Sequence, residues 1–154
     1  MERLKEALSA AGIAYKENEP LCAHCTFRIG GPADLFVLPE NEEQLCAAIR
    51  LAKEAGVRSY LLGNGSNILF EDAGYRGAVI NVSAMKSGIG VIENISFPGK
   101  DPALTYDAVV VGAGQMLSSL CMAALENSLT GLEFAYGIPG TVGGAVYMNA
   151  GAYG

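Results

Sequence analysis

The segment LLGNGSNILF (Leu61–Phe70) decides the fold, because it places a small glycine loop between two short apolar runs. Each run is too short for a helix and predicts a strand. Glycine permits positive backbone angles and close approach of a ligand, so successive N–H groups of the loop can form an anion-binding concavity. A plain hairpin turn is the alternative, since Asn-Gly is a strong hairpin signal. The candidate binding residues are Gly63, Asn64, Gly65, Ser66 and Asn67.

A second glycine-rich segment, YGIPGTVGGAVYMNAGAYG, covers Tyr136–Gly154. Pro139 fixes one backbone angle, Thr141 supplies a hydroxyl, and the pair Gly143–Gly144 lets the chain lie flat against a large planar or phosphate-bearing ligand. A loose glycine-rich terminus is the alternative, but a flexible tail has no need of apolar side chains. The segment contains several of these, namely Ile138, Val142, Val146, Tyr147 and Met148.

The composition predicts one soluble domain. The chain has 154 residues, of which 51% are hydrophobic and 17% charged, and this is enough to bury one core of ordinary size. The net charge of −6 carries no basic cluster, so nucleic acid is not an expected partner. No apolar run approaches the roughly 18 residues that span a bilayer, and MERLKEALSA lacks the apolar core of a secretory signal. We therefore expect a cytoplasmic protein without a membrane partner.

The cysteines Cys22, Cys25, Cys46 and Cys121 are expected to be reduced thiols in the cytoplasm. Cys22 and Cys25 flank His24 in the sequence CAHC. A structural zinc site needs a second ligand pair at similar spacing, and the sequence contains none. No metal is therefore predicted, and a redox dithiol is only slightly more favoured.

Apolar spacing predicts helices over residues 4–11, 41–55 and 117–125. In the second helix Asn41 can cap and Gln44 can reach back, while Leu45, Ala48, Ile49 and Ala52 form a stripe. The third helix repeats Leu117, Leu120, Cys121, Ala124 and Leu125 at helical spacing.

Strands are predicted at ADLFVLP, RSYLL, NILF, GAVINV and AVVV, with VIENISF as a further candidate and GKDPALTYD as a hairpin or loop. This order is not a regular alternation of strand and helix. It predicts a strand-rich α+β fold.

The stretch VVVGAGQML also resembles the start of a dinucleotide fold, with a strand, Gly112, Gly114 and then a helix. The third small residue of that fingerprint lets helix and strand pack closely, and Leu117 stands there instead. Glu133 lies where a ribose-binding acid is expected, but GLEFAYG lacks the apolar run of a buried parallel strand. A Rossmann fold is therefore disfavoured.

Three segments in register resemble the UDP-N-acetylenolpyruvoylglucosamine reductase family, also called UDP-N-acetylmuramate dehydrogenases. They are TFRIGGPAD (Thr26–Asp34), LLGNGSNILF and GLEFAYGIPGTVGGAVYMNAGAYG, and the resemblance covers nearly the whole chain. Residues 87–107 are longer and less familiar than this family suggests. The resemblance implies an FAD-binding α+β domain of the vanillyl-alcohol-oxidase type, with FAD held noncovalently between two subdomains.

The resemblance also implies site residues. The amides of Gly63–Asn67 would face the FAD pyrophosphate, and Arg28 and Gly30 would lie near the adenine and ribose. The flavin would be lined by Ile138, Pro139, Gly140, Thr141, Gly144, Tyr147, Gly151 and Tyr153, with Tyr153 on the substrate side.

The implied reaction reduces UDP-GlcNAc-enolpyruvate to UDP-N-acetylmuramate with NADPH, for peptidoglycan precursor synthesis. Its catalytic arginine, serine and glutamate are expected after Gly154, in a substrate-binding part that this chain lacks. We therefore expect residues 1–154 to be a truncated FAD-binding domain, inactive alone and a weak FAD binder or none.

Two alternatives remain. The first is another flavin-dependent oxidoreductase of this fold, such as an oxidase with covalent FAD. Covalent attachment commonly uses a histidine or cysteine near the first glycine loop, and neither occurs in Leu61–Phe70. The second is a noncatalytic nucleotide-binding module, in which FAD would have no effect on melting.

Overall fold

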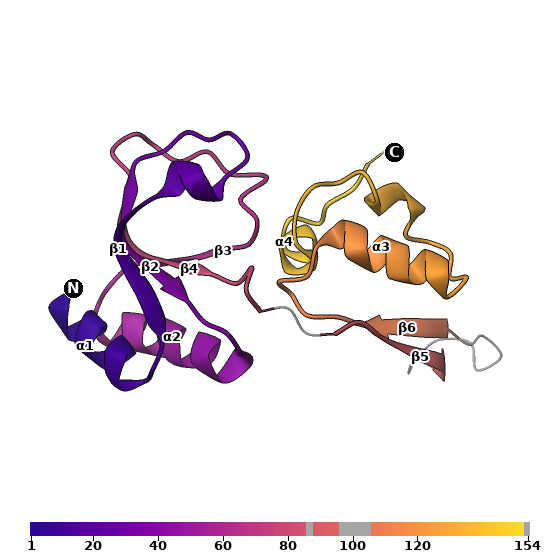
Figure 1. Cartoon of the computed structure of the whole chain (residues 1–154), viewed down its shortest axis with the longest axis horizontal. Helices are drawn as coiled ribbons and strands as arrows, with labels where there is room; N and C mark the ends of the chain where they lie inside the picture. The colour runs from indigo at the N-terminus through magenta and orange to yellow at the C-terminus, as the bar shows by residue number, and fades with distance from the viewer. Residues whose placement is uncertain (86–87, 96–105, 153–154) are drawn as a thin grey trace. The chain divides into compact units, whose positions relative to one another are not determined.

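The computed structural model describes residues 1–85, 88–95 and 106–152, and it divides the chain into two compact units, 1–85 and 86–154 (Figure 1). Each unit combines helices with a small sheet, which agrees with the predicted α+β class. The expectation of one domain stays a prediction, because compactness does not decide whether the units act as one cofactor-binding domain.

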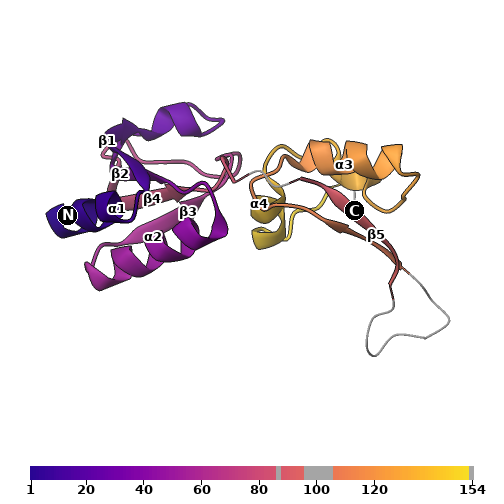
Figure 2. The same cartoon turned by 60° about the horizontal axis from the view of Figure 1, so that its bottom comes forward.

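The first unit is a four-stranded sheet with the order β1-β2-β4-β3. β1 runs antiparallel to β2, whereas β2, β4 and β3 are parallel. The helices α1 and α2 lie together on one face of this sheet (Figure 2). The elements are α1 (Glu2–Ala10), β1 (Ala14–Pro20), a 3-10 turn η1 (Leu21–His24), β2 (Pro32–Leu38), α2 (Glu42–Glu54), β3 (Ser59–Leu62) and β4 (Tyr75–Asn81).

The central strand β2 is buried on both faces, as its apolar run predicts. Leu35 and Val37 pack against the helix side with Leu4 and Leu8, while Phe36 packs on the other side. Fully burying such side chains contributes about 1.5–3 kcal/mol each. β2 therefore joins two small cores, and the core opposite the helices lies next to the first glycine loop.

The start of α2 confirms the predicted cap. The Asn41 side chain accepts a hydrogen bond from the Gln44 N–H at 2.9 Å. The Gln44 side chain reaches back to the N–H of Glu40 at 2.8 Å, one residue before the cap. Ala48 and Ala52 are buried as predicted, but Ile49 is 38% exposed, so the stripe is narrower than its spacing suggests.

The second unit has a two-stranded antiparallel sheet and a helical region. Leu117, Leu120, Cys121 and Ala135 form its core. Leu125 is 67% exposed, so it does not belong to the predicted apolar stripe of the third helix. The elements are β5 (Gly90–Ile95), β6 (Tyr106–Val110), α3 (Leu117–Glu126), a 3-10 turn η2 (Glu133–Ala135) and α4 (Val142–Tyr147). Most of the loop predicted at GKDPALTYD lies outside the described residues.

Three local predictions were wrong or incomplete. NILF is not a strand: Phe70 is buried and Ile68 partly buried against the second core, so the run anchors a loop by burial without a ladder partner. The strand β1 was missed because it is an exposed edge strand of mostly polar residues. The predicted flat segment contains α4, whose first turn is capped by Thr141.

Candidate functional site

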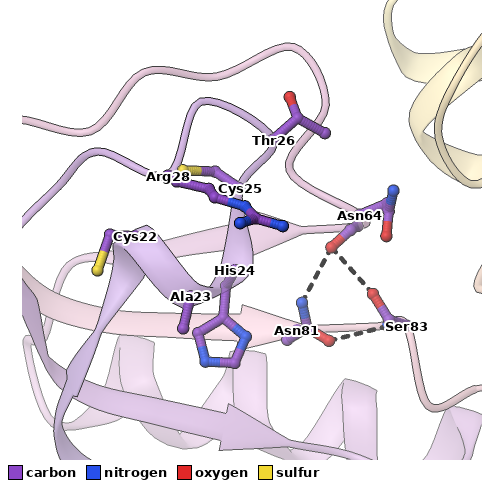
Figure 3. A pocket seen from close by; sticks show the side chains of 10 residues that line it. Cys22, Ala23, His24, Cys25, Thr26, Arg28, Asn64, Asn81 and Ser83 are labelled. Atoms are coloured by element: carbon purple, nitrogen blue, oxygen red, sulfur yellow. Dashed lines mark hydrogen bonds between the residues drawn. The ribbon is translucent and has the colours of Figure 1, made fainter.

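The first glycine loop follows β3 and lies beside the end of β4. Because these neighbouring strands are parallel, their carboxyl ends meet at one edge, with Leu62 paired to Asn81. A cavity of about 770 Å³ opens there (Figure 3). It is lined by Cys22, Ala23, His24, Cys25, Thr26, Arg28, Gly63, Asn64, Asn81 and Ser83.

Gly65 is buried in this loop with φ +64. A Cβ at Gly65 would clash with the carbonyl oxygen of His24 and would lie 2.8 Å from Cα of Cys25. The N–H of Thr26 also donates to the Gly65 carbonyl at 3.1 Å. Glycine is therefore required here by contact with the backbone after η1, in addition to any ligand.

The donors of this loop suit an anion. Within the described part of the chain, the N–H groups of Asn64, Gly65 and Asn67 have no hydrogen-bond acceptor. The cavity lining contains the guanidinium-bearing Arg28 and no carboxylate. Unpaired amides beside a cation are the donor set that a diphosphate needs. The residues present therefore fit the pyrophosphate of FAD.

His24 is held firmly in the cavity wall. Its Nε2 lies 2.8 Å from Oε1 of Glu19, and its ring stacks on Phe36 with centroids 4.1 Å apart. Glu19 also pairs with Lys16 at 2.8 Å. The hydrogen bond from Lys16, and after it the one from His24, lowers the pKa of the Glu19 carboxyl below its ordinary value.

The second glycine segment is fixed to the loop that precedes α3. The N–H of Val142 donates to Gln115 O at 2.8 Å, and the N–H of Gly143 donates to Ala113 O at 2.9 Å. Thr141 is 1% exposed, and its hydroxyl accepts from the Gly144 N–H at 3.3 Å. The hydroxyl that the sequence offered to a ligand therefore caps α4.

The far end of α4 is exposed and apolar. Val146 is 76% exposed, Tyr147 86% and Met148 50%. Gly151 has open space where a Cβ would project. An exposed apolar surface of this kind suits a planar ring such as a flavin.

The structure separates the predicted site residues into two groups. Gly63, Asn64 and Arg28 line the cavity of the first unit, whereas Gly30 packs against Phe70. The other predicted residues of the first loop, Gly65, Ser66 and Asn67, directly follow the lining pair. Ile138, Pro139, Gly140, Thr141, Gly144, Tyr147 and Gly151 lie in the second unit, and Tyr153 lies outside the described residues.

Sequence reasoning missed His24, Asn81 and Ser83. In the sequence, Asn81 is recognisable only as a polar residue at the end of an apolar strand. Its position beside the first glycine loop depends on the parallel pairing of β3 with β4. In the sequence, His24 stands out only through its place between Cys22 and Cys25. In the described ranges, no three His, Cys, Asp or Glu side chains are placed to hold a metal ion, and no helix is long and apolar enough to cross a membrane.

Comparisons with known proteins identify the family of this chain. The family of FAD binding domains matches residues 33–154. UDP-N-acetylenolpyruvoylglucosamine reductases of Clostridium perfringens (strain 13 / Type A) and Anoxybacillus flavithermus are 41% and 42% identical to this chain, covering 99% and 100% of it. The chain spans about half the length of these curated relatives, 47% of each.

Solved structures show the same fold. The UDP-N-acetylenolpyruvylglucosamine reductase of Thermus caldophilus matches with a TM-score of 0.60 and 30% identity, over 91% of this chain and 43% of that one. A variant of Physcomitrella patens BBE-like 1 matches with a TM-score of 0.53 and 25% identity, over 81% of this chain and 26% of its own. The predicted fold class, not Rossmann, is confirmed. The chain belongs to the family of FAD binding domains, and over nearly its whole length it is similar to part of the UDP-N-acetylenolpyruvoylglucosamine reductases.

Proposed function

We propose that this chain is part of a cytoplasmic reductase that converts UDP-GlcNAc-enolpyruvate to UDP-N-acetylmuramate with NADPH, in peptidoglycan precursor synthesis. The observation that carries the proposal is 41–42% identity, over nearly the whole chain, to reductases of that name. The cavity lined by Gly63, Asn64 and Arg28 supports it, because the Asn64 N–H has no acceptor among the described residues.

Each glycine segment has its own role in this proposal. The amides of Gly63–Asn67 bind the FAD pyrophosphate, and Arg28 adds a positive charge. In the second unit, the backbone of Ile138, Pro139 and Gly144 and the exposed Tyr147 and Gly151 contact the flavin, while the buried Gly140 and Thr141 support this wall from behind. Tyr153, which lies outside the described residues, stays a predicted contact of the flavin.

Bound FAD supplies the two-electron chemistry between NADPH and the enolpyruvyl double bond. The residues of this chain hold the cofactor at its diphosphate and at its flavin. The groups that polarise the substrate carboxylate and donate a proton lie beyond Gly154 in the proposal. Residues 1–154 alone are therefore expected to show no turnover.

FAD retention tests the proposed binding residues. The chain is mixed with FAD, and flavin absorbance and fluorescence are measured after gel filtration. Arg28→Gln removes the charge at the cavity and Tyr147→Ala removes the exposed ring, whereas Arg50→Gln is a matched control on the exposed side of α2. Retention should fall in the first two variants and not in the control.

A chain that retains no flavin is tested again with the remaining half of a full-length relative. Rescue means that the missing half supplies needed contacts. Failure of this rescue contradicts the flavin-binding assignment.

A covalent flavoprotein of the same fold is the second candidate, because the structure brings His24 and Cys25 next to Gly65. Both residues lie outside Leu61–Phe70, the segment that contains no histidine or cysteine. Acid precipitation of the FAD-loaded protein separates the two candidates. Flavin released into the supernatant supports the noncovalent reductase, and flavin in the pellet supports covalent attachment.

A further inference from the structure

The carbonyl oxygen of Gly63 receives two side-chain hydrogen bonds from the segment that ends β4. The Asn81 amide nitrogen donates to it at 2.9 Å, and the Ser83 hydroxyl donates to it at 2.9 Å (Figure 3). Two donors on one loop carbonyl fix the orientation of the peptide that joins Gly63 to Asn64.

Asn81 is itself locked. Its side-chain oxygen accepts from the Ser83 N–H at 3.1 Å, and this leaves its nitrogen to face Gly63. Asn81 is 7% exposed, and it and Thr141 are the buried polar side chains among the described residues. A buried polar group is costly unless it is hydrogen-bonded, so its partners matter. Asn81 is hydrogen-bonded to Gly63 in the first glycine loop, and Thr141 is hydrogen-bonded to Gly144 in the second glycine segment.

The orientation of this peptide matters because a trans peptide points its C=O and N–H in opposite directions. Since Asn81 and Ser83 hold the Gly63 carbonyl, the N–H of Asn64 faces away from them. That N–H has no acceptor within the described residues, and Asn64 lines the cavity. Glycine at position 63 makes a peptide flip inexpensive, and a flipped peptide would present an oxygen to an anion instead of an N–H.

We propose that Asn81 and Ser83 are positioning residues for diphosphate binding: they prevent the Gly63–Asn64 peptide from flipping and keep the Asn64 N–H available to the FAD pyrophosphate. This inference rests on the proposed function. Both side chains also line the cavity, but the role proposed for them acts through the Gly63–Asn64 peptide.

The test compares three ligands in Ser83 variants. FAD and ADP carry a diphosphate, whereas riboflavin carries the flavin ring without phosphate. Dissociation constants are measured by quenching of flavin fluorescence and, for ADP, by competition with FAD. Ser83→Ala removes one donor, and Ser83→Thr retains the hydroxyl. Asn41→Ala is the control, because it removes the α2 cap without touching the cavity.

Ser83→Ala should lower the affinity for FAD and for ADP by about five- to tenfold, which is the loss expected for one hydrogen bond. The affinity for riboflavin should not change. Ser83→Thr should restore the affinity. Asn41→Ala should lower thermal stability without this ligand-selective loss. The affinities are measured with the remaining half of a relative added if the wild type needs it.

Wild-type binding of FAD with an unaffected Ser83→Ala overturns the inference alone. The inference is also overturned if the affinity for riboflavin falls as much as that for FAD, because the substitution then does not act on the diphosphate. No FAD binding by the wild type, even with the added half, overturns the proposed function, and the inference falls with it.

Discussion

At the scale of single residues, Gly65 is constrained twice, by φ +64 and by the backbone of His24 and Cys25. Gly56 is a matched control, because it has φ +67 and no neighbour within 4 Å of an added Cβ. Gly56→Ala should cost about 1–2 kcal/mol for the left-handed backbone alone. Gly65→Ala should cost more, because the η1 segment must also move. Urea unfolding measures both, and equal losses would contradict the close approach.

Glu19 makes the stability of the first unit depend on pH. Its pKa is lowered from 4.5 by Lys16 and then by His24, so the ionised carboxylate is favoured in the folded state. A lowered carboxyl pKa contributes stability above the unfolded value and loses it as the pH falls through the folded value. Wild type should therefore exceed Glu19→Gln in thermal stability at neutral pH.

The difference in thermal stability between wild type and Glu19→Gln should shrink as the pH falls below 4.5. Thermal unfolding of both proteins across the acidic range measures it. Glu71→Gln is a control, because Glu71 has no ion pair within the described residues. A difference that stays constant with pH would show that the Glu19 pairs are not the cause.

At the scale of elements, α4 depends on one buried hydroxyl. Its sequence VGGAVY has two glycines, which disfavour a helix by about 1 kcal/mol each. Thr141→Val keeps the side-chain shape but removes the cap on the Gly144 N–H, so it should destabilise the second unit by about 1 kcal/mol. Thr141→Ser should retain the cap.

The rate of alkylation of the buried Cys121 reports this change. Thr141→Val should raise that rate about fivefold, as expected for 1 kcal/mol, and Thr141→Ser should raise it less. Equal rates in the two variants would exclude a capping role for the hydroxyl.

Elements with local signals were predictable, and elements fixed by distant contacts were not. α2 has its own cap and β2 its own apolar run, so both were found from sequence. β1 exists because β2 offers it an edge, and NILF is a loop because the first unit provides a core that buries Phe70.

The same distinction applies to the site. The composition of Gly63–Asn67, with two glycines and small polar residues, is enough to predict a binding loop. Asn81 and Ser83 approach it only because β4 lies parallel to β3, and nothing local in the sequence specifies that pairing. The cap role of Thr141 likewise required a helix that its glycines disfavour.

At the scale of the whole molecule, cysteines report on each compact unit. Cys25 is 7% exposed in the first core, Cys121 is 8% exposed in the second, and Cys46 is exposed. Burial also raises the pKa of the Cys121 thiol, which lowers its thiolate fraction. Cys46 should therefore be alkylated rapidly, while Cys25 and Cys121 react mainly through opening of their own units.

FAD should slow the alkylation of Cys121 if the second unit contributes contacts to the cofactor. A ligand at 100 times its dissociation constant stabilises the bound state by about 2.7 kcal/mol, which corresponds to roughly a hundredfold slower opening. Cys25 should be protected as well, by stabilisation and by direct shielding at the cavity. Mass spectrometry of alkylated peptides with and without FAD measures both rates, and Cys46 should be unaffected. Protection of Cys25 without Cys121 would confine cofactor binding to the first unit and contradict the proposed role of Tyr147 and Gly151.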